Sequence, residues 1–314
     1  MKIFVTGGNG YKGSVLIPKL LKEGHQVTSF DTNWFGNYLE ENKSLNCIRG
    51  DIRDLNLLSL DGFDTVIHLA NVANDPAVDL NPTMSWEINV LAGQQLIEKA
   101  KTSKVKQFIF ASSGSVYGIK KEEKVTEDLS LVPISTYNKT KMIAEKVFSS
   151  YEKFMKVHSI RPATVCGLSP RMRLDVAVNL LTFQALSKNK ITVLGGTQVR
   201  PNIHIDDICE VYIHFIRRGD FIDSGFYNAG FENISILDIA KLIQQKTKCE
   251  IEIKKSNDPR SYRQDSTKLI NTGFSPKKNI SCAIDELISA FEKGKLKDRA
   301  EFHTVSWMKR QNIE

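Results

Sequence analysis

A tyrosine and a lysine four residues apart, Tyr137 and Lys141, are the clearest candidates for chemistry in the sequence. Side chains at positions i and i+4 of a helix lie on the same face. A lysine ammonium close to a phenol favours the phenolate by charge, and this lowers the pKa of the tyrosine. A tyrosine with a lowered pKa can exchange a proton with a sugar or alcohol hydroxyl near neutral pH.

The start of the chain predicts a site for a dinucleotide. Residues 2–6 form a short apolar run that is typical of a buried strand, and apolar residues recur at helical spacing over 15–21. Between the two lie four glycines, Gly7, Gly8, Gly10 and Gly13. Such glycines let the backbone turn tightly and approach a pyrophosphate, whose charge then lies at the N-terminus of the helix. A second predicted strand, 26–30, is followed by Asp31, whose carboxylate can accept hydrogen bonds from a ribose hydroxyl.

Asp31 also indicates which dinucleotide binds. Its carboxylate would repel the 2′-phosphate of NADP, and the residues that follow, Thr32-Asn33-Trp34, offer no arginine to offset this repulsion. The sequence therefore predicts NAD as the cofactor.

Strands and helices alternate through the first half of the chain. Further strands are expected at 45–49, 65–69, 107–111 and 157–161, with helices over 84–100 and 136–151. Alternating units of this length predict an α/β fold with a Rossmann, doubly wound parallel sheet. Ligands bind at the carboxyl ends of strands in such a sheet, and the serine-rich segment 111–118 lies at one of these ends.

Two other strand ends carry candidates for cofactor contacts. Asp51 and Ile52 follow the third strand, where the carboxylate could bind the adenine amino group while the apolar side chain covers the ring. Asp51 could equally cap a helix. Leu69 and Ala70 end the fourth strand, and a small residue there lets the backbone lie against the cofactor.

Two polar residues fall in apolar surroundings and are expected to be structural. His68 is interpreted as a core histidine with its hydrogen bonds satisfied rather than a catalyst. Asn89 lies inside an apolar helix, and because a buried asparagine needs partners, we expect it to tie that helix to the neighbouring strand.

Composition narrows the class of protein and its compartment. The chain has 314 residues, a net charge of +7 and five widely spaced cysteines. No metal-ligand spacing appears among the cysteines and histidines, so no metal site is expected, and a reducing compartment fits. No arginine-rich block suggests nucleic-acid binding, no apolar run could span a membrane, and no signal peptide is evident. We expect a cytoplasmic protein whose mildly basic surface suits an anionic nucleotide substrate.

Together these motifs resemble the extended short-chain dehydrogenases/reductases, and within them the NAD-dependent epimerase/dehydratase group that acts on nucleotide sugars. The resemblance rests on TGGNGYKG at 6–13, Asp31, SSGSVYG at 112–118 and YNKTK at 137–141, and it extends to about residue 290. It implies cofactor contacts from Gly7, Gly10, Tyr11, Lys12, Gly13, Asp31, Asp51, Ile52, Leu69, Ala70, Tyr137 and Lys141. It implies a catalytic set of Ser113, the acid/base Tyr137 and Lys141, which would bind the nicotinamide ribose.

The chain departs from the family pattern at two positions. Lys12 stands where the family usually has an apolar residue, and we expect its stem to pack while its charge reaches solvent. Cys166 stands where a tyrosine is usual, and it is interpreted as a small apolar filler. Arg171 and Arg173 lie in the string PRMRLDVAVN, 170–179, which resembles a subgroup that acts on bacterial surface-sugar precursors and so implies carbohydrate biosynthesis. These two arginines could bind phosphate or simply line the surface.

The resemblance also implies substrate contacts in the second half of the chain. Asn179 would contact the diphosphate-sugar and Arg200 the diphosphate, because arginine offers paired donors that suit phosphate. Either Arg260 or Arg263 would be the second clamp residue, with Arg263 favoured. His204 and Asp206 are expected to hold the returning strand in place.

The expected division of the chain follows from these assignments. Residues 1–167 would form the Rossmann domain, with a returning segment near 203–230. A smaller mixed α/β lobe, 168–202 and 231–295, would bind the nucleotide sugar, and 296–314 would form a tail. The family and the long helices 84–100 and 136–151, which could pair across a two-fold axis, predict a homodimer.

The activity that this resemblance implies is epimerisation of a nucleotide sugar at C4 through a transient 4-keto sugar. A 4,6-dehydratase would need a neighbouring acid and base, normally carboxylates, where this chain has Gly114 and Ser115. A 4-dehydrogenase or keto-sugar reductase would keep the same catalytic residues, and a non-catalytic binding protein is the remote alternative. The sequence does not identify the base or the sugar.

Overall fold

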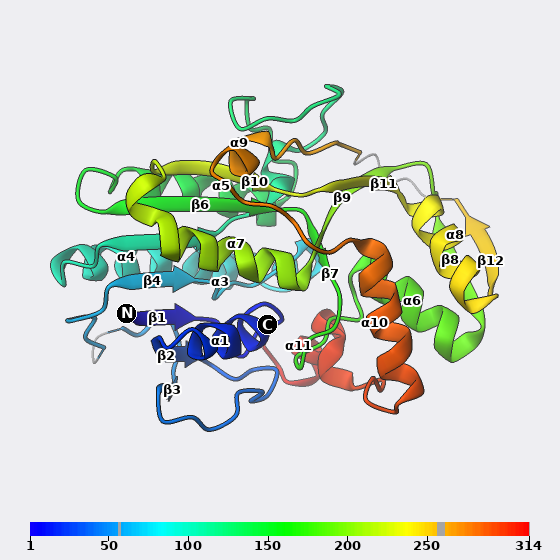
Figure 1. The fold of residues 1–314 in the computed structure, drawn as a ribbon, viewed down its shortest axis with the longest axis horizontal. Coiled ribbons are helices and arrows are strands. Elements are labelled where there is room, and N and C mark those ends of the chain that lie inside the picture. The colour runs from blue at the N-terminus through cyan, green and yellow to red at the C-terminus, as the bar shows by residue number, and fades with distance from the viewer. Residues whose placement is uncertain (56–57, 256–260, 314) are drawn as a thin grey trace.

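The centre of the molecule is a seven-stranded parallel sheet with the strand order β10-β6-β5-β4-β1-β2-β3. The computed structural model describes residues 1–55, 58–255 and 261–313 (Figure 1). The strands of this sheet are β1 (Lys2–Thr6), β2 (Gln26–Asp31), β3 (Leu45–Arg49), β4 (Thr65–His68), β5 (Gln107–Ala111), β6 (Lys156–Pro162) and β10 (Gly225–Ala229). The predicted α/β, doubly wound sheet is confirmed.

Apolar helices cover both faces of this sheet, which is why its central strands are apolar throughout. One face packs against α1 (Gly13–Lys22) and α7 (Ile205–Arg218), whose residues Leu16 and Phe215 are fully buried. The other face packs against α4 (Ala92–Thr102) and α5 (Thr136–Ser149), through Leu96 and Phe148 among others. The two layers fix the carboxyl edge of the sheet, where the candidate site residues gather.

A smaller lobe lies beside this edge, at the right of Figure 1. It contains the parallel pair β8 (Lys190–Leu194) and β12 (Glu250–Lys254), with a core of its own formed with α6 (Ala177–Lys188), α8 (Ile236–Thr247) and α10 (Ile280–Glu292). A second sheet, of β11 (Glu232–Ser235), β9 (Val199–His204) and β7 (Thr164–Cys166), joins the lobe to the main sheet. The mixed α/β character of the lobe was predicted, whereas the exact domain boundaries stay a prediction.

The helix expected over 84–100 is interrupted in the structure. It is built from α3 (Pro82–Trp86), a π-helical turn η1 (Glu87–Leu91) and α4. Asn89 lies in that turn, where it accepts a hydrogen bond from the Val72 amide and donates to the Val72 carbonyl and the Thr140 hydroxyl. Asn89 thus ties its helix to the segment after β4 and to α5, as expected.

The last segment of the chain, expected as a tail, packs onto the rest of the molecule. The 3-10 turn η4 (Ala300–Phe302) leads into the last helix, α11 (Thr304–Arg310). Earlier in the chain lie two other short elements, the 3-10 turn η3 (Gly219–Phe221) and the helix α9 (Thr267–Asn271). Met308 is only 1% exposed, and the indole N–H of Trp307 donates a 2.6 Å hydrogen bond to the Trp34 carbonyl.

None of the described helices combines the length and the apolar character that crossing a membrane requires. The five cysteines are all free thiols, and three of them, Cys166, Cys209 and Cys249, are buried. Cys166 is fully buried and its thiol lies 3.6 Å from the Ile203 carbonyl, which fits a small filler. Lys12, the other departure from the family pattern, does not send its charge to solvent as expected, because its ammonium donates to the hydroxyl of the buried Tyr212 at 3.4 Å.

Candidate active site

The glycine turn between β1 and α1 needs its glycines for steric reasons. Gly7 has φ of +75°, and a Cβ added there would lie 2.6 Å from the Ala70 amide nitrogen. A Cβ on Gly13 would lie 2.4 Å from the Gly7 carbonyl oxygen. The Gly10 amide donates to the Gly7 carbonyl at 3.1 Å. The turn is therefore pressed against the end of β4 and directs the N-terminus of α1 at the groove above the sheet.

A pocket opens beside this turn at the carboxyl edge of the sheet. Its walls are Gly7, Asn9, Gly10, Phe30, Asp31, Thr32, Trp34, Phe35, Gly50, Asp51, Ile52, Leu69, Ala70, Asn71 and Ile88. Most of the residues predicted to bind the cofactor therefore line one cavity, although they come from four separate strand ends. Aromatic and aliphatic walls with a few polar groups are typical of a nucleotide pocket.

Asp31 lies at the end of β2 in this pocket. Its two carboxylate oxygens accept hydrogen bonds from the Asn9 amide at 2.9 Å and the Asn33 amide at 2.7 Å. Burial raises the pKa of Asp31, while these two hydrogen bonds and the positive charge of Arg171 oppose that rise. The sequence neighbours of Asp31 supply no arginine, but a distant part of the chain does.

Asp51 caps no helix among the described residues. Its oxygens accept from the backbone amide of Arg53 at 2.9 Å and from the Arg53 guanidinium at 2.8 Å. Burial raises the pKa of Asp51, but the hydrogen bonds from Arg53 outweigh this effect and lower it. The structure places the carboxylate in the pocket wall beside Ile52; its contact with adenine stays a prediction.

Ser113, Tyr137 and Lys141 converge at the end of β5. Ser113 precedes the short helix η2 (Gly114–Tyr117), and its hydroxyl contacts that of Ser115 at 2.7 Å. Tyr137 lies in the first turn of α5 and shares a hydrogen bond with Ser113. The Lys141 ammonium lies 5.9 Å from the centre of the Tyr137 ring and donates a 2.6 Å hydrogen bond to the Ala111 carbonyl.

The expected lowering of the Tyr137 pKa by Lys141 is wrong in direction. Burial, the largest effect, raises the Tyr137 pKa to about 12, and the opposing groups are the Ser113 hydroxyl and the positive charge of Arg173. Burial and the nearby Lys12 lower the pKa of Lys141 itself, and Lys141 is not among the groups that shift the pKa of Tyr137. The structure therefore makes Arg173 the cation that acts on the tyrosine.

Arg171 is buried and Arg173 is half-buried, and whether either of them binds phosphate stays a prediction. Arg173 forms a two-point ion pair with Asp175, at 2.8 and 3.1 Å. Arg171 is 97% buried, with its guanidinium 4.1 Å from the centre of the Phe35 ring in the pocket wall. The Nε–H group of Arg171 has no hydrogen-bond partner in the structure, so it is available to donate to a ligand.

A buried ion pair beneath the site was not predicted. Glu145 and Arg161 are 0% and 2% exposed and pair at 2.8 Å. Glu145 also accepts a 2.6 Å hydrogen bond from the Ser112 hydroxyl, next to Ser113, and Arg161 donates to the Tyr117 hydroxyl at 2.7 Å. The spacing of Glu145 four residues after Lys141 was the available signal, since it puts both on one face of α5.

The residues predicted to bind substrate are less closely grouped. Asn179 is buried, and its amide bonds the Gly167 N–H, the Tyr11 hydroxyl and the Arg173 carbonyl, each at 3.0 Å. Arg200 lies half-buried in β9, whereas Arg263 is exposed on the segment that bridges to Val125. Arg260 lies outside the described residues. The substrate role of these residues stays a prediction.

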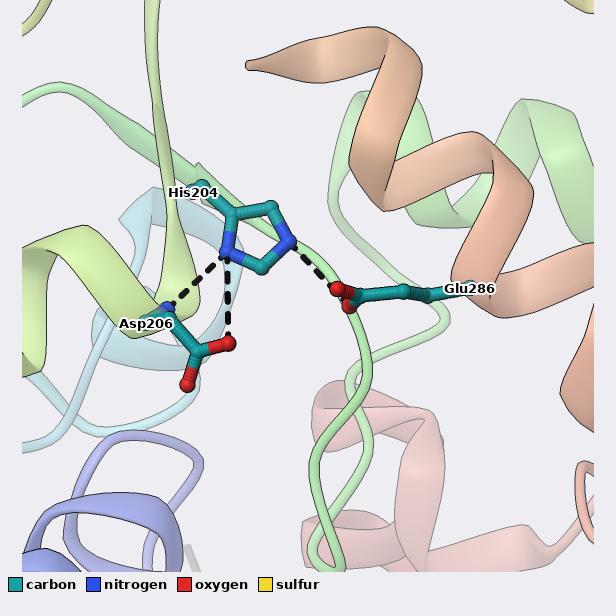
Figure 2. A group of neighbouring side chains, drawn as sticks. All are labelled: His204, Asp206 and Glu286. Atoms are coloured by element: carbon teal, nitrogen blue, oxygen red, sulfur yellow. Dashed lines mark hydrogen bonds and ion pairs between the residues drawn. The ribbon is translucent and has the colours of Figure 1, made fainter. Parts of the chain in front are cut away.

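The cluster His204, Asp206 and Glu286 has the residue types of a metal site (Figure 2). His204 Nδ1 accepts from the Asp206 amide at 3.0 Å, so Nε2 carries the hydrogen that is donated to Glu286 at 3.1 Å. Lys278 bonds both carboxylates, at 2.5 and 2.6 Å, and Lys19 pairs with Asp206 at 3.1 Å, so two lysines balance the two carboxylates. The group therefore ties β9 and α7 to α10, which agrees with the expected structural role of His204 and Asp206.

The comparisons with known proteins agree with this geometry. The model of the NAD dependent epimerase/dehydratase family matches residues 3–230. The chain is 30% identical to UDP-glucose 4-epimerase from Lactobacillus helveticus, over 88% of this chain and 92% of that one. The protein belongs to the NAD-dependent epimerase/dehydratase family. This confirms the resemblance, and with it NAD as the cofactor.

Solved structures of similar proteins extend the match over nearly the whole chain. UDP-glucuronic acid 4-epimerase from Bacillus cereus, solved with UDP-glucuronic acid and NAD, has a TM-score of 0.83 and 30% identity over 93% of this chain and 99% of that one. The dTDP-glucose 4,6-dehydratase DesIV from Streptomyces venezuelae, solved with NAD bound, has a TM-score of 0.85 at 21% identity, over 94% and 98%. The second likeness shows the fold alone.

Proposed function

We propose that the protein is an NAD-dependent nucleotide-sugar epimerase that inverts C4 through a transient 4-keto sugar. The observation that carries the proposal is the convergence of Ser113, Tyr137 and Lys141 beside the nucleotide pocket. The 4-epimerases among its relatives support the same reaction. The sugar and the base of the substrate are left open.

In the proposed mechanism, Tyr137 is the acid/base and Ser113 positions it against the substrate. The tyrosine takes the proton of the C4 hydroxyl and later returns it, with the Ser113 hydroxyl hydrogen-bonded to the same oxygen. NAD held in this groove would supply the hydride acceptor and donor for C4, while the sugar turns between the two hydride transfers. Lys141 binds the nicotinamide ribose, and its bond to the Ala111 carbonyl fixes its position.

The other cofactor contacts are proposed from the walls of the pocket and the glycine turn. Gly7, Gly10, Tyr11, Lys12 and Gly13 surround the pyrophosphate, Asp31 binds the adenosine ribose, Asp51 and Ile52 bind adenine, and Leu69 and Ala70 lie against the cofactor. The unoccupied lone pairs of the Asp31 carboxylate suit a ribose hydroxyl, because both of its present partners are backbone donors.

The small lobe is proposed to bind the diphosphate of the substrate through Asn179, Arg200 and Arg263. The net charge of +7 favours such an anionic substrate. We also infer a cytoplasmic homodimer that acts in carbohydrate biosynthesis. In the proposed division of the chain, the NAD domain consists of residues 1–167 and a returning segment, 203–230. The substrate lobe consists of residues 168–202 and 231–295, followed by the C-terminal segment 296–314.

A panel of UDP-, GDP-, CDP- and dTDP-sugars, incubated with pure protein without added cofactor, tests the reaction. Conversion to the C4 isomer is expected. Loss of water would instead mark a dehydratase, and turnover only with added NAD or NADH would mark a net dehydrogenase or reductase. Gly114 and Ser115, which offer no carboxylate beside Ser113, argue against the dehydratase. The Tyr137→Phe variant, assayed in parallel, shows whether the conversion is due to this protein or to a contaminating enzyme.

A further inference from the structure

The turn that carries the catalytic serine packs against a segment from much later in the chain. Ser113 lies between β5 and η2, and Gly114 is the first residue of η2. A Cβ added to Gly114 would lie 3.1 Å from Nε2 and 3.2 Å from Oε1 of Gln264. Gln264 is 3% exposed, so its side chain is enclosed at this contact. The absence of a side chain on Gly114 therefore provides the space that the Gln264 amide fills.

The backbone around Gln264 is held in place on two sides. The Val125 amide donates to the Arg263 carbonyl at 2.8 Å, and the Asp265 amide donates to the Val125 carbonyl at 3.0 Å. The Gln264 amide donates to Asn233 Oδ1 at 2.9 Å, and Asn233 Nδ2 donates back to the Gln264 carbonyl at 3.1 Å. Val125 lies in the loop between η2 and α5, and Asn233 lies in β11. The segment is thus fixed to the loop beside the site and to the sheet that joins the two lobes.

The Gln264 side chain reaches both ends of η2. Its Nε2 donates to the Arg161 carbonyl at 2.7 Å and to Asn228 Oδ1 at 2.9 Å. The same Asn228 oxygen accepts a 2.8 Å hydrogen bond from the hydroxyl of Tyr117, the last residue of η2. Gln264 therefore packs directly on the start of η2 and is linked to its end through one buried asparagine.

The hydrogen bonds continue to the residue before the catalytic serine. The Arg161 guanidinium donates to the Tyr117 hydroxyl at 2.7 Å and pairs with Glu145 at 2.8 Å. Glu145 in turn accepts the 2.6 Å hydrogen bond from the Ser112 hydroxyl. Removing one member of a buried network leaves its partners without a hydrogen bond, so such a network fixes the positions of the groups it joins. The residues on both sides of Ser113 are held by this one network.

We propose that Gln264 is a positioning residue for Ser113, so that a segment of the substrate lobe supports the catalytic serine. The inference rests on the proposed function, in which the Ser113 hydroxyl bonds the oxygen of Tyr137. A displacement of about 1 Å can cost about 100-fold in rate, so a contact that fixes η2 affects catalysis through Ser113. Arg263, the neighbour of Gln264, is the proposed contact to the diphosphate. One short segment would then serve both substrate binding and the placement of the serine.

The test is the steady-state kinetics of epimerisation with a nucleotide sugar that wild type converts. We expect Gln264→Leu to lower kcat about 10- to 100-fold while KM stays within about threefold, because the contact acts on the reaction step. Gln107→Leu is the matched control. Gln107 is also buried, at the opposite end of β5, and its Nε2 donates to the Phe215 carbonyl at 2.7 Å. Both variants should lower the melting temperature, but only Gln264→Leu should lower the kcat of the folded protein.

A double-mutant cycle separates positioning of Ser113 from a general loss of structure. If Gln264 acts through Ser113, then Gln264→Leu should change kcat by no more than about threefold in a Ser113→Ala background. Gly114→Ala disturbs the same contact from the other side, because its Cβ presses on the Gln264 amide. It should lower kcat severalfold, and it serves as the test if Gln264→Leu does not fold.

An unchanged kcat in folded Gln264→Leu would overturn the inference, and so would an unchanged kcat in Gly114→Ala if Gln264→Leu does not fold. Losses that multiply in the double variant would overturn it as well, because Gln264 would then act independently of Ser113. An equal loss of kcat in Gln107→Leu would reduce Gln264 to a structural role. A wild-type protein that epimerises none of the nucleotide sugars would instead refute the proposed function, so the two failures are distinguishable.

Discussion

The two halves of the groove are built differently. On the cofactor side, Asp31 is held by two backbone amides and the glycine turn is pressed against Ala70, so the ligand groups are fixed by the fold. On the substrate side the side chains are less enclosed: Arg200 is half-buried in β9 and Arg263 is exposed, although Gln264 beside it is hydrogen-bonded to the Arg161 carbonyl of β6. The proposed function therefore predicts a cofactor site that is largely preformed and a substrate site whose arginine side chains are ordered when the nucleotide sugar binds.

The largest effect is expected where the two halves meet, at Tyr137. Tyr137→Phe keeps the ring and its packing but removes the group that transfers the proton, so turnover should fall about 10²- to 10⁴-fold. Binding of NAD and of the nucleotide sugar, measured by calorimetry, should change little. Near-normal turnover in this variant would mean that another group is the base.

A smaller but specific effect is expected for the preformed half. Asp31→Ala removes an acceptor for the ribose and should weaken NAD binding about 10- to 100-fold. The same change removes the repulsion of a 2′-phosphate while Arg171 stays nearby, so the preference for NAD over NADP should narrow. Glu40→Ala, an exposed carboxylate, is the matched control. Equal affinity of wild type for the two cofactors would contradict the role of Asp31.

Arg173 offers a test of the electrostatics at the junction. The reactive form of Tyr137 is the phenolate, and burial raises its pKa to about 12, so turnover should rise with pH through the neutral range. Arg173→Met removes an opposing positive charge and should shift this rise to higher pH, with about a tenfold lower neutral rate for each unit of pKa. If the pH profiles of Arg173→Met and wild type were superimposable, Arg173 would not act on Tyr137. Lys141→Ala differs from Arg173→Met in that it should also weaken cofactor binding.

A still smaller effect is expected on the substrate side. Arg263→Ala should raise the KM for the nucleotide sugar severalfold, up to about tenfold, because an exposed arginine gives a modest charge-assisted contact. The affinity for NAD should be unchanged, since the groups that hold the cofactor lie across the groove. If the variant instead lost NAD affinity and kept its KM, the division of the groove into two halves would be wrong.

A substitution on the surface away from both halves of the groove should change neither turnover nor NAD affinity. Leu91 is 58% exposed on η1, which packs beside α5, and these two elements form the proposed dimer face. Leu91→Glu should shift the protein towards monomers in light scattering while the turnover per subunit and the NAD affinity stay as in wild type. A wild-type protein that is monomeric at micromolar concentration would rule out the dimer itself.

Local patterns were enough to predict most of the cofactor half. The strand, the glycine turn and Asp31 are neighbours in sequence, and the period of the apolar residues gave the order of strands and helices. The tie formed by Asn89 was predicted, but the π-helical turn η1 in which it lies was not, because the apolar period over 84–100 continues through the turn. The prediction that the pKa of Tyr137 is lowered was wrong for a related reason. Burial and Arg173 act on Tyr137 through the tertiary fold, whereas the spacing along one helix indicates only Lys141.

The contact between the two tryptophans has a consequence for how the protein is made. Trp34, in the wall of the nucleotide pocket, accepts its hydrogen bond from Trp307, 273 residues later in the sequence. Folding during synthesis proceeds from the N-terminus, so the sheet and the glycine turn can form before α11 has been made. The Trp34 side of the pocket gains this support only once residue 307 has been synthesised, so this wall is completed later than the glycine turn opposite it.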